Sequence, residues 1–77
     1  MSHNFVKLTC TELDKSNMVC KYDLRIKATD IQVLVATELP LVNQPPLSVT
    51  FVWLPGGTRI SVSETITEVE RRIEEAL

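Results

Sequence analysis

The chain has 77 residues, of which 44% are hydrophobic, and a formal net charge of −2. Its length allows one small domain, and its apolar content is that of a folded globular protein rather than a disordered one. The slight acidic excess argues against non-specific nucleic-acid binding, which needs cations to displace counterions from phosphates. A domain this small buries only roughly 60% of its unfolded surface, so association with another chain would stabilise it.

The sequence carries no targeting or membrane signal that we recognise. No apolar run approaches the roughly 18 residues that span a membrane. The N-terminus lacks a basic segment followed by an apolar core, so no secretory signal is predicted. We therefore expect a cytoplasmic protein without membrane contact.

The N-terminal half predicts a long β-hairpin. After a loose tail, Met1–Asn4, the segments at about 5–11 and 18–28 alternate apolar and polar side chains, which is the period of a half-buried strand. Leu13–Asn17 is typical of the turn between them. The register that gathers the apolar groups on one face pairs Leu8 with Tyr22, Val6 with Leu24, Cys10 with Cys20 and Lys7 with Asp23.

A third strand is predicted at about 31–37. Its segment Val33–Ala36 is apolar on both faces, as in a central strand or one covered by a partner. Glu38–Pro46 is predicted to be a long loop, because its three prolines disfavour regular structure. The loop is unusually apolar for a connection between strands.

The C-terminal third predicts a second hairpin and a helix. Strands at about 47–54 and 58–62 flank Gly56-Gly57, which suits a two-residue type I′ turn that requires positive φ at both positions. This turn places Trp53 opposite Ile60 and Phe51 opposite Val62. The core face of the first strand is then expected to carry Leu47, Val49, Phe51 and Trp53.

A helix is predicted at about 64–76. Thr65 and Glu68 have the spacing of a capping box, with Ser63 as a competing N-cap. Apolar residues then recur at helical spacing in one stripe, which comprises Ile66, Val69, Ile73, Ala76 and Leu77. The predicted fold is α+β: one domain with an antiparallel sheet of about five strands, arranged as a meander of hairpins, and one C-terminal amphipathic helix packed on one face.

Catalytic chemistry is not predicted. The histidine, His3, lies in the expected tail, so a Ser or Cys nucleophile has no positioned base. Two cysteines without a second ligand pair do not make a closed zinc site. We favour free thiols over a Cys10–Cys20 disulfide, because the expected compartment is reducing. We expect no enzyme activity, catalytic residue, metal, cofactor or small-molecule substrate.

Two surfaces are candidates for binding. The outer face of the first hairpin carries a basic strip that suits an acidic partner or a nucleic-acid backbone, or that simply keeps the sheet face solvated; it comprises Lys7, Lys21, Arg25 and Lys27. Apolar residues on the phase opposite the expected core, together with the apolar loop, predict an interface. Its candidate residues are Leu34, Leu39, Leu41, Val42, Val52 and Leu54.

Three segments resemble the small FlbD-type proteins of flagellar and swarming-motility operons: Phe5–Thr9, Leu24–Ile31 and Gly57–Val69. The centre and end also resemble, more weakly, the back half of LytTR-type DNA-binding domains. The first resemblance implies a bacterial or phage protein without catalytic residues. Altogether we expect a non-catalytic interaction or regulatory module that forms a homo-oligomer or binds another protein. The alternative is a small nucleic-acid-binding transcriptional regulator that uses the basic strip.

Overall fold

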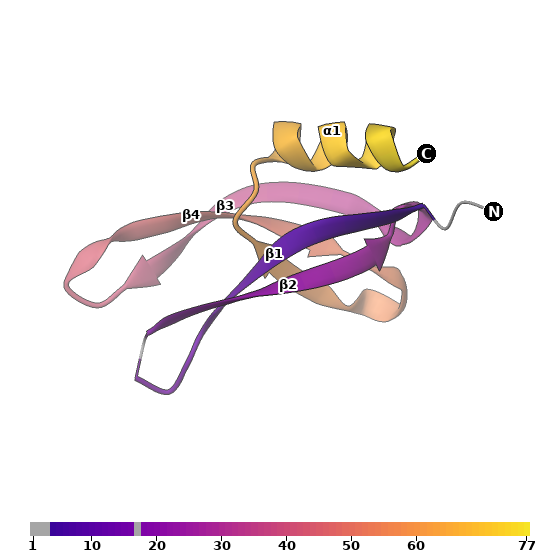
Figure 1. Cartoon of the computed structure of the whole chain (residues 1–77). Helices are drawn as coiled ribbons and strands as arrows, with labels where there is room; N and C mark the ends of the chain where they lie inside the picture. Colours follow the sequence, from indigo (N-terminus) through magenta and orange to yellow (C-terminus); the bar gives the residue numbers. More distant parts are fainter. Residues whose placement is uncertain (1–3, 17) are drawn as a thin grey trace.

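The computed structural model describes residues 4–16 and 18–77, so the expected tail lies outside it apart from Asn4. In this part of the chain five strands form one open sheet, and a single α-helix covers one of its faces (Figure 1). The predicted α+β class is therefore confirmed. The elements are β1 (Phe5–Leu13), β2 (Val19–Lys27), β3 (Val33–Leu41), β4 (Gln44–Trp53), β5 (Arg59–Val62) and α1 (Ile66–Ala76), with short 3-10 turns at Ala28–Asp30 and Pro55–Gly57.

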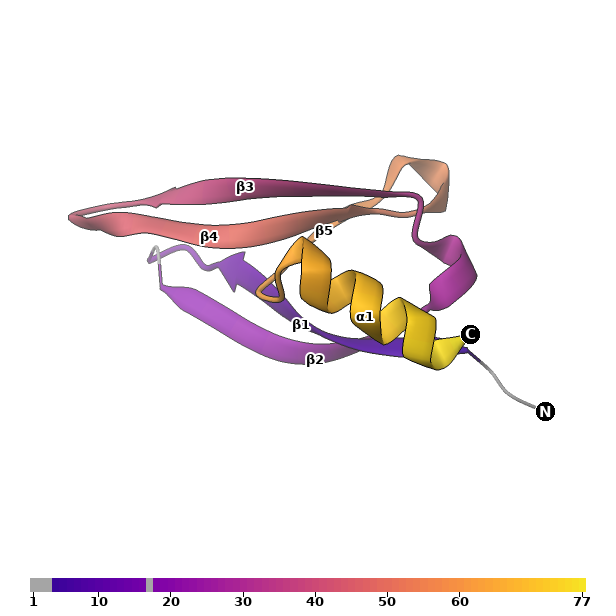
Figure 2. The same cartoon turned by 90° about the horizontal axis from the view of Figure 1, so that it is seen from above.

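The order of the strands differs from a meander. It is β2-β1-β5-β4-β3, so β2 and β3 form the two edges although they follow one another in the chain. The short β5 joins two long hairpins by pairing with β4 and, at Cys10 and Val62, with β1. Figure 2 shows α1 lying over the sheet between the β1–β2 and β3–β4 hairpins.

The first hairpin has a register two residues away from the predicted one. Leu8 lies opposite Leu24, and Cys10 lies opposite Tyr22. A shift of two residues leaves every side chain on its expected face, because side chains alternate with a period of two. The prediction of this core face therefore holds for the half of the hairpin away from its tip, whereas Met18, Cys20 and Tyr22 on the same face are exposed, and the predicted pairs are wrong.

The two cysteines are separated by this register. Cys20 lies opposite Glu12 rather than opposite Cys10. Cys10 is buried, Cys20 is exposed, and both are free thiols, as favoured from the sequence.

The second hairpin has a register one residue away from the predicted one. Leu54 N–H donates to the Thr58 carbonyl at 2.8 Å, so three residues, Pro55–Gly57, form the loop. Both glycines have the predicted positive φ, 81° and 80°. The third loop residue places Trp53 opposite Arg59, and Val52 opposite Ile60.

This one-residue slip reverses the faces of β4, so the prediction of its core face is wrong for Phe51 and Trp53, although Val49 on the same face is buried outside the main core cluster. Val52 is fully buried in the core, whereas Phe51 and Trp53 lie on the opposite face and are only half-buried. The pattern could not decide between the faces, because both phases of β4 near the turn are apolar.

The predicted loop at Glu38–Pro46 is wrong as well, because β3 continues to Leu41 and β4 begins at Gln44. Pro40 lies at a register shift between Leu39 and Leu41 on an edge strand, a position where a sheet tolerates proline. Asn43, with φ of 58°, supplies the left-handed conformation that the tight turn needs.

The helix begins as its capping signal predicts. Thr65 is the N-cap, and its hydroxyl accepts the Glu68 N–H at 3.1 Å. The helix thus starts two residues after the predicted position. Val69 packs at the centre of its buried stripe, flanked by Ile73 and Ala76. The buried core comprises Val6, Leu8, Ile26, Ala28, Val52, Val62 and Val69.

Candidate functional site

The predicted apolar interface is not a continuous surface. Val52 belongs to the core, and both Leu34 and Leu54 pack against that core, so these three residues do not form part of an exposed interface. Leu39 and Leu41 are half-buried in β3, and Val42 is exposed at the β3–β4 turn. The prediction fails because it depended on the wrong phase of β4.

A different apolar surface lies on the sheet face that α1 leaves uncovered. Val33 pairs with Trp53, and Val35 pairs with Phe51, so the four side chains form two adjacent cross-strand rows. The two valines are 50% and 42% exposed, and the two aromatic residues are half-buried. We call these four residues, together with Arg59, the outer patch.

Arg59 covers part of the aromatic surface. Its guanidinium carbon lies 4.2 Å from the centroid of the Phe51 ring and 5.6 Å from that of Trp53. Such cation–π contacts contribute about 0.5–1 kcal/mol at exposed sites. They also hold the long side chain in one place, so less conformational entropy is lost when a partner binds over it.

The basic strip forms as predicted on the outer face of the β1–β2 hairpin. Its four side chains, Lys7, Lys21, Arg25 and Lys27, are all exposed. Lys7 lies directly opposite Arg25, an unfavourable pairing of like charges that is partly relieved because Lys7 Nζ reaches Asp23 at 3.4 Å. The strip is therefore an exposed cationic surface with one internal counter-charge.

A polar network completes the side of β1 that faces away from β2. The Glu64 carboxylate accepts the Thr9 N–H at 2.9 and 3.1 Å, and Ser63 N–H donates to the Thr9 carbonyl at 2.9 Å. The Arg72 guanidinium donates to the Lys7 carbonyl at 2.7 Å. The Ser63 backbone and the side chains of Glu64 and Arg72 thus provide hydrogen bonds that a neighbouring strand would otherwise supply.

Arg72 also joins the carboxylates of this network. It contacts Glu64 at 3.2 Å and Glu68 at 2.8 Å, and the Glu64 side chain is only 8% exposed. Hydrogen bonds from Arg71 and then from Arg72 lower the pKa of Glu68 to about 2. Because this pKa is lowered, Glu68 keeps its charge to about pH 2 in the folded protein, and its contribution to stability is complete above its ordinary pKa of 4.5 and is lost progressively as the pH falls from 4.5 toward 2.

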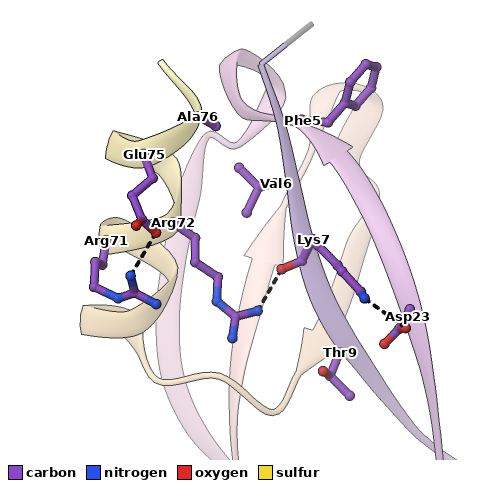
Figure 3. A pocket seen from close by; sticks show the side chains of 9 residues that line it. All are labelled: Phe5, Val6, Lys7, Thr9, Asp23, Arg71, Arg72, Glu75 and Ala76. Atoms are coloured by element: carbon purple, nitrogen blue, oxygen red, sulfur yellow. Dashed lines mark hydrogen bonds and ion pairs between the residues drawn. The ribbon is translucent and has the colours of Figure 1, made fainter.

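Beside this network lies an open groove of about 580 Å³ between α1 and β1 (Figure 3). The cationic groups that line it already have acidic partners. Lys7 contacts Asp23, Arg71 contacts both Glu68 and Glu75, and Arg72 contacts Glu64. The groove therefore offers an incoming anion no unpaired cation among its lining residues.

Tyr22 makes a further polar contact between β1 and β2. The Tyr22 hydroxyl donates to Glu12 at 3.0 Å, and the neighbouring Cys10 and Glu12 side chains raise the pKa of this phenol. Within residues 4–16 and 18–77, no three His, Cys, Asp or Glu side chains could jointly hold a metal ion. Nor does any helix in the described chain have the length and apolar character to cross a membrane.

Sequence reasoning missed two parts of these surfaces. Nothing distinguishes Glu64 from other surface carboxylates in the sequence, because its partners Thr9 and Arg72 are brought to it by the fold. The outer patch did leave a signal, since Phe51 and Trp53 are spaced as neighbours on one face. The sequence did not show whether this face of β4 points to the core or to the outside.

Comparisons with known protein families, with curated proteins and with solved structures find no match for this chain.

Proposed function

We propose that this protein is a non-catalytic interaction module that associates with a second copy of itself through the outer patch. The main support is that two aromatic and two valine side chains form adjacent cross-strand rows on the sheet face that α1 leaves uncovered. Aromatic residues and Arg are enriched at protein interfaces, and Trp and Arg are frequent hot-spot residues. The patch holds a single cation, Arg59, which suits a protein partner better than a polyanion.

The small size of the chain favours a second copy of the same protein as the partner that covers this surface. A 77-residue domain has a small core, and association would bury further apolar surface that folding alone leaves exposed. A regulatory role, a cytoplasmic location and kinship with FlbD-type proteins remain part of the proposal.

Val35→Lys tests the proposal, because it places a charge in the outer patch, beside Phe51. Light scattering across a concentration series should give the wild type a mass near twice 8.7 kDa. We expect the lysine to raise the Kd of self-association at least about tenfold, since an unpaired charge in an apolar interface costs more than ~1.4 kcal/mol.

Met18→Lys is the matched control, because Met18 is exposed at the tip of the first hairpin, away from the patch. It should leave the Kd unchanged. A wild type that stays monomeric at its highest soluble concentration would refute the proposal, as would equal effects of the two lysines.

The basic strip supports a second candidate function, binding to nucleic acid. The observation in its favour is that Lys7 and Arg25 are held directly opposite one another, an arrangement that an anion would stabilise. We rank it second because Asp23 interrupts the strip and the chain is acidic overall.

Retention on heparin at low salt tests this candidate. If it is correct, the wild type is retained, and the double change Lys21→Glu with Arg25→Glu abolishes retention. Lys15→Glu, a charge reversal in the turn outside the strip, should leave most of the retention intact. Absence of wild-type retention at low salt would eliminate the candidate.

A further inference from the structure

The two edges of the sheet differ in charge. β2 carries four charged residues along its outer face, Lys21, Asp23, Arg25 and Lys27. β3 has one charged residue, Glu38, among its nine. Charged side chains protect an edge strand from pairing with another chain, and long apolar edges invite such pairing. β3 is therefore the less protected edge.

We propose that β3 pairs antiparallel with β3 of a second copy, around a two-fold axis at Thr37, so that two five-stranded sheets join into one. This inference rests on the proposed self-association but places the contact at the β3 edge, where Val33 and Val35 of the outer patch take part and Phe51, Trp53 and Arg59 stay on the open face of the joined sheet. A two-fold axis makes the same strand serve both partners, which is the usual arrangement of a homodimer interface.

The side chains of β3 match under this symmetry. Val35 lies opposite the second copy's Leu39, and Val33 lies opposite its Leu41, so apolar groups meet apolar groups. On the other face Ala36 lies opposite the second copy's Glu38, so like charges are not placed directly opposite each other. The outer patches of the two copies then lie on the same face of the joined sheet.

The backbone hydrogen bonds have the required phase. Leu54 N–H bonds the Thr58 carbonyl, one step beyond the last pair, Trp53 with Arg59, so even-numbered β4 residues direct their backbone groups toward β5. Odd-numbered β4 residues therefore face β3, as the bond from Gln32 N–H to the Trp53 carbonyl also shows.

In β3 the odd-numbered residues then face β4, because Val33 pairs with Trp53. The backbone groups of Leu34, Ala36 and Glu38 consequently point to the open edge. Pro40 has no N–H to donate there, but its carbonyl remains an acceptor. The pairing can thus extend from Leu34 to Pro40 and end at the proline.

Cysteine cross-linking tests this geometry in a Cys20→Ser background that removes the exposed thiol. Thr37 sits on the axis in a non-hydrogen-bonded pair, where Cβ atoms are ~4.5–5.5 Å apart. Thr37→Cys should therefore give a covalent dimer on mild oxidation, seen by non-reducing electrophoresis. Val35→Cys and Leu39→Cys should cross-link when mixed, but neither should do so alone, because like positions lie about four residues, ~13 Å, apart along the strand.

Charge changes at Ala36 provide a second test without cysteine. Ala36→Glu places two carboxylates opposite one another at two symmetric positions, and it should raise the Kd roughly tenfold relative to Ala36→Lys. Circular dichroism and Trp53 fluorescence confirm that each variant is folded.

The outcomes separate this inference from the proposed function. A wild-type dimer whose Thr37→Cys variant does not cross-link would overturn β3 pairing and leave self-association standing. Cross-linking of Val35→Cys alone as efficient as that of Thr37→Cys would also overturn the register. A monomeric wild type would overturn both proposals.

Discussion

Replacing Val52 with alanine should lower the free energy of unfolding by about 2–3 kcal/mol. Val52 is fully buried beneath α1, and its truncation removes two methyl groups and leaves a cavity that the surrounding core closes only in part. The measurement is urea denaturation followed by the fluorescence of Trp53, at a protein concentration low enough to keep the chain monomeric.

Val35→Ala is the matched control for this change. Val35 belongs to the same two-stranded β3–β4 ladder, but it lies on the outer face and is 42% exposed. Its truncation should cost no more than about 1 kcal/mol, mostly through lost β propensity. If Val35→Ala costs as much as Val52→Ala, the faces assigned to β3 and β4 are wrong.

Replacing Glu64 with alanine should destabilise the fold by about 2–4 kcal/mol. The change removes the acceptor of the Thr9 N–H and leaves Arg72 with one carboxylate partner fewer, in a region where Glu64 is nearly buried. Loss of one partner from a buried hydrogen-bonded charge network costs more than the network's net contribution, because the remaining groups stay desolvated. Glu64→Gln retains one acceptor and should cost less.

Glu75→Ala is the matched control for Glu64→Ala. Glu75 pairs with Arg71 at 2.8 Å on the helix surface, where its side chain is 64% exposed. Exposed pairs of this kind contribute about 0.3–0.5 kcal/mol, so this alanine should have little effect. Equal costs for the two alanines in denaturation experiments would show that the Glu64 network does not anchor the C-terminal segment to β1.

The first hairpin shows how far alternation predicts a fold. Its apolar phase predicted the buried face correctly even though each predicted pair was two residues out of register. The length of the turn decides the pairing, and the turn residues Asp14 and Ser16 carry no signal strong enough to specify it. The carboxylate of Asp14 accepts N–H groups of Ser16 and Met18 at 2.8 and 2.9 Å, which stabilises the observed turn.

The second hairpin shows where alternation fails. Gly56 and Gly57 predicted a turn with positive φ, and both residues adopt positive φ. Pro55 also belongs to the loop, however, and this third residue shifts the register by one. A shift by one residue exchanges the two faces of a strand. As a result, Phe51 and Trp53, which were predicted to face the core, lie in the outer patch, and three predicted interface residues became core or its packing partners.

The sequence by itself determines where most of the strands lie, where the helix is capped and which face of the first hairpin is buried near the end away from its turn. These features depend on local periodicity and on Thr65 and Glu68, so neighbouring residues suffice to specify them. Only the tertiary structure decided that β5 lies between β1 and β4, that Phe51 and Trp53 face outward, and that Glu64 meets Thr9. The physical reason is that these outcomes depend on contacts between residues distant in the chain, where packing under α1 selects one of two apolar faces.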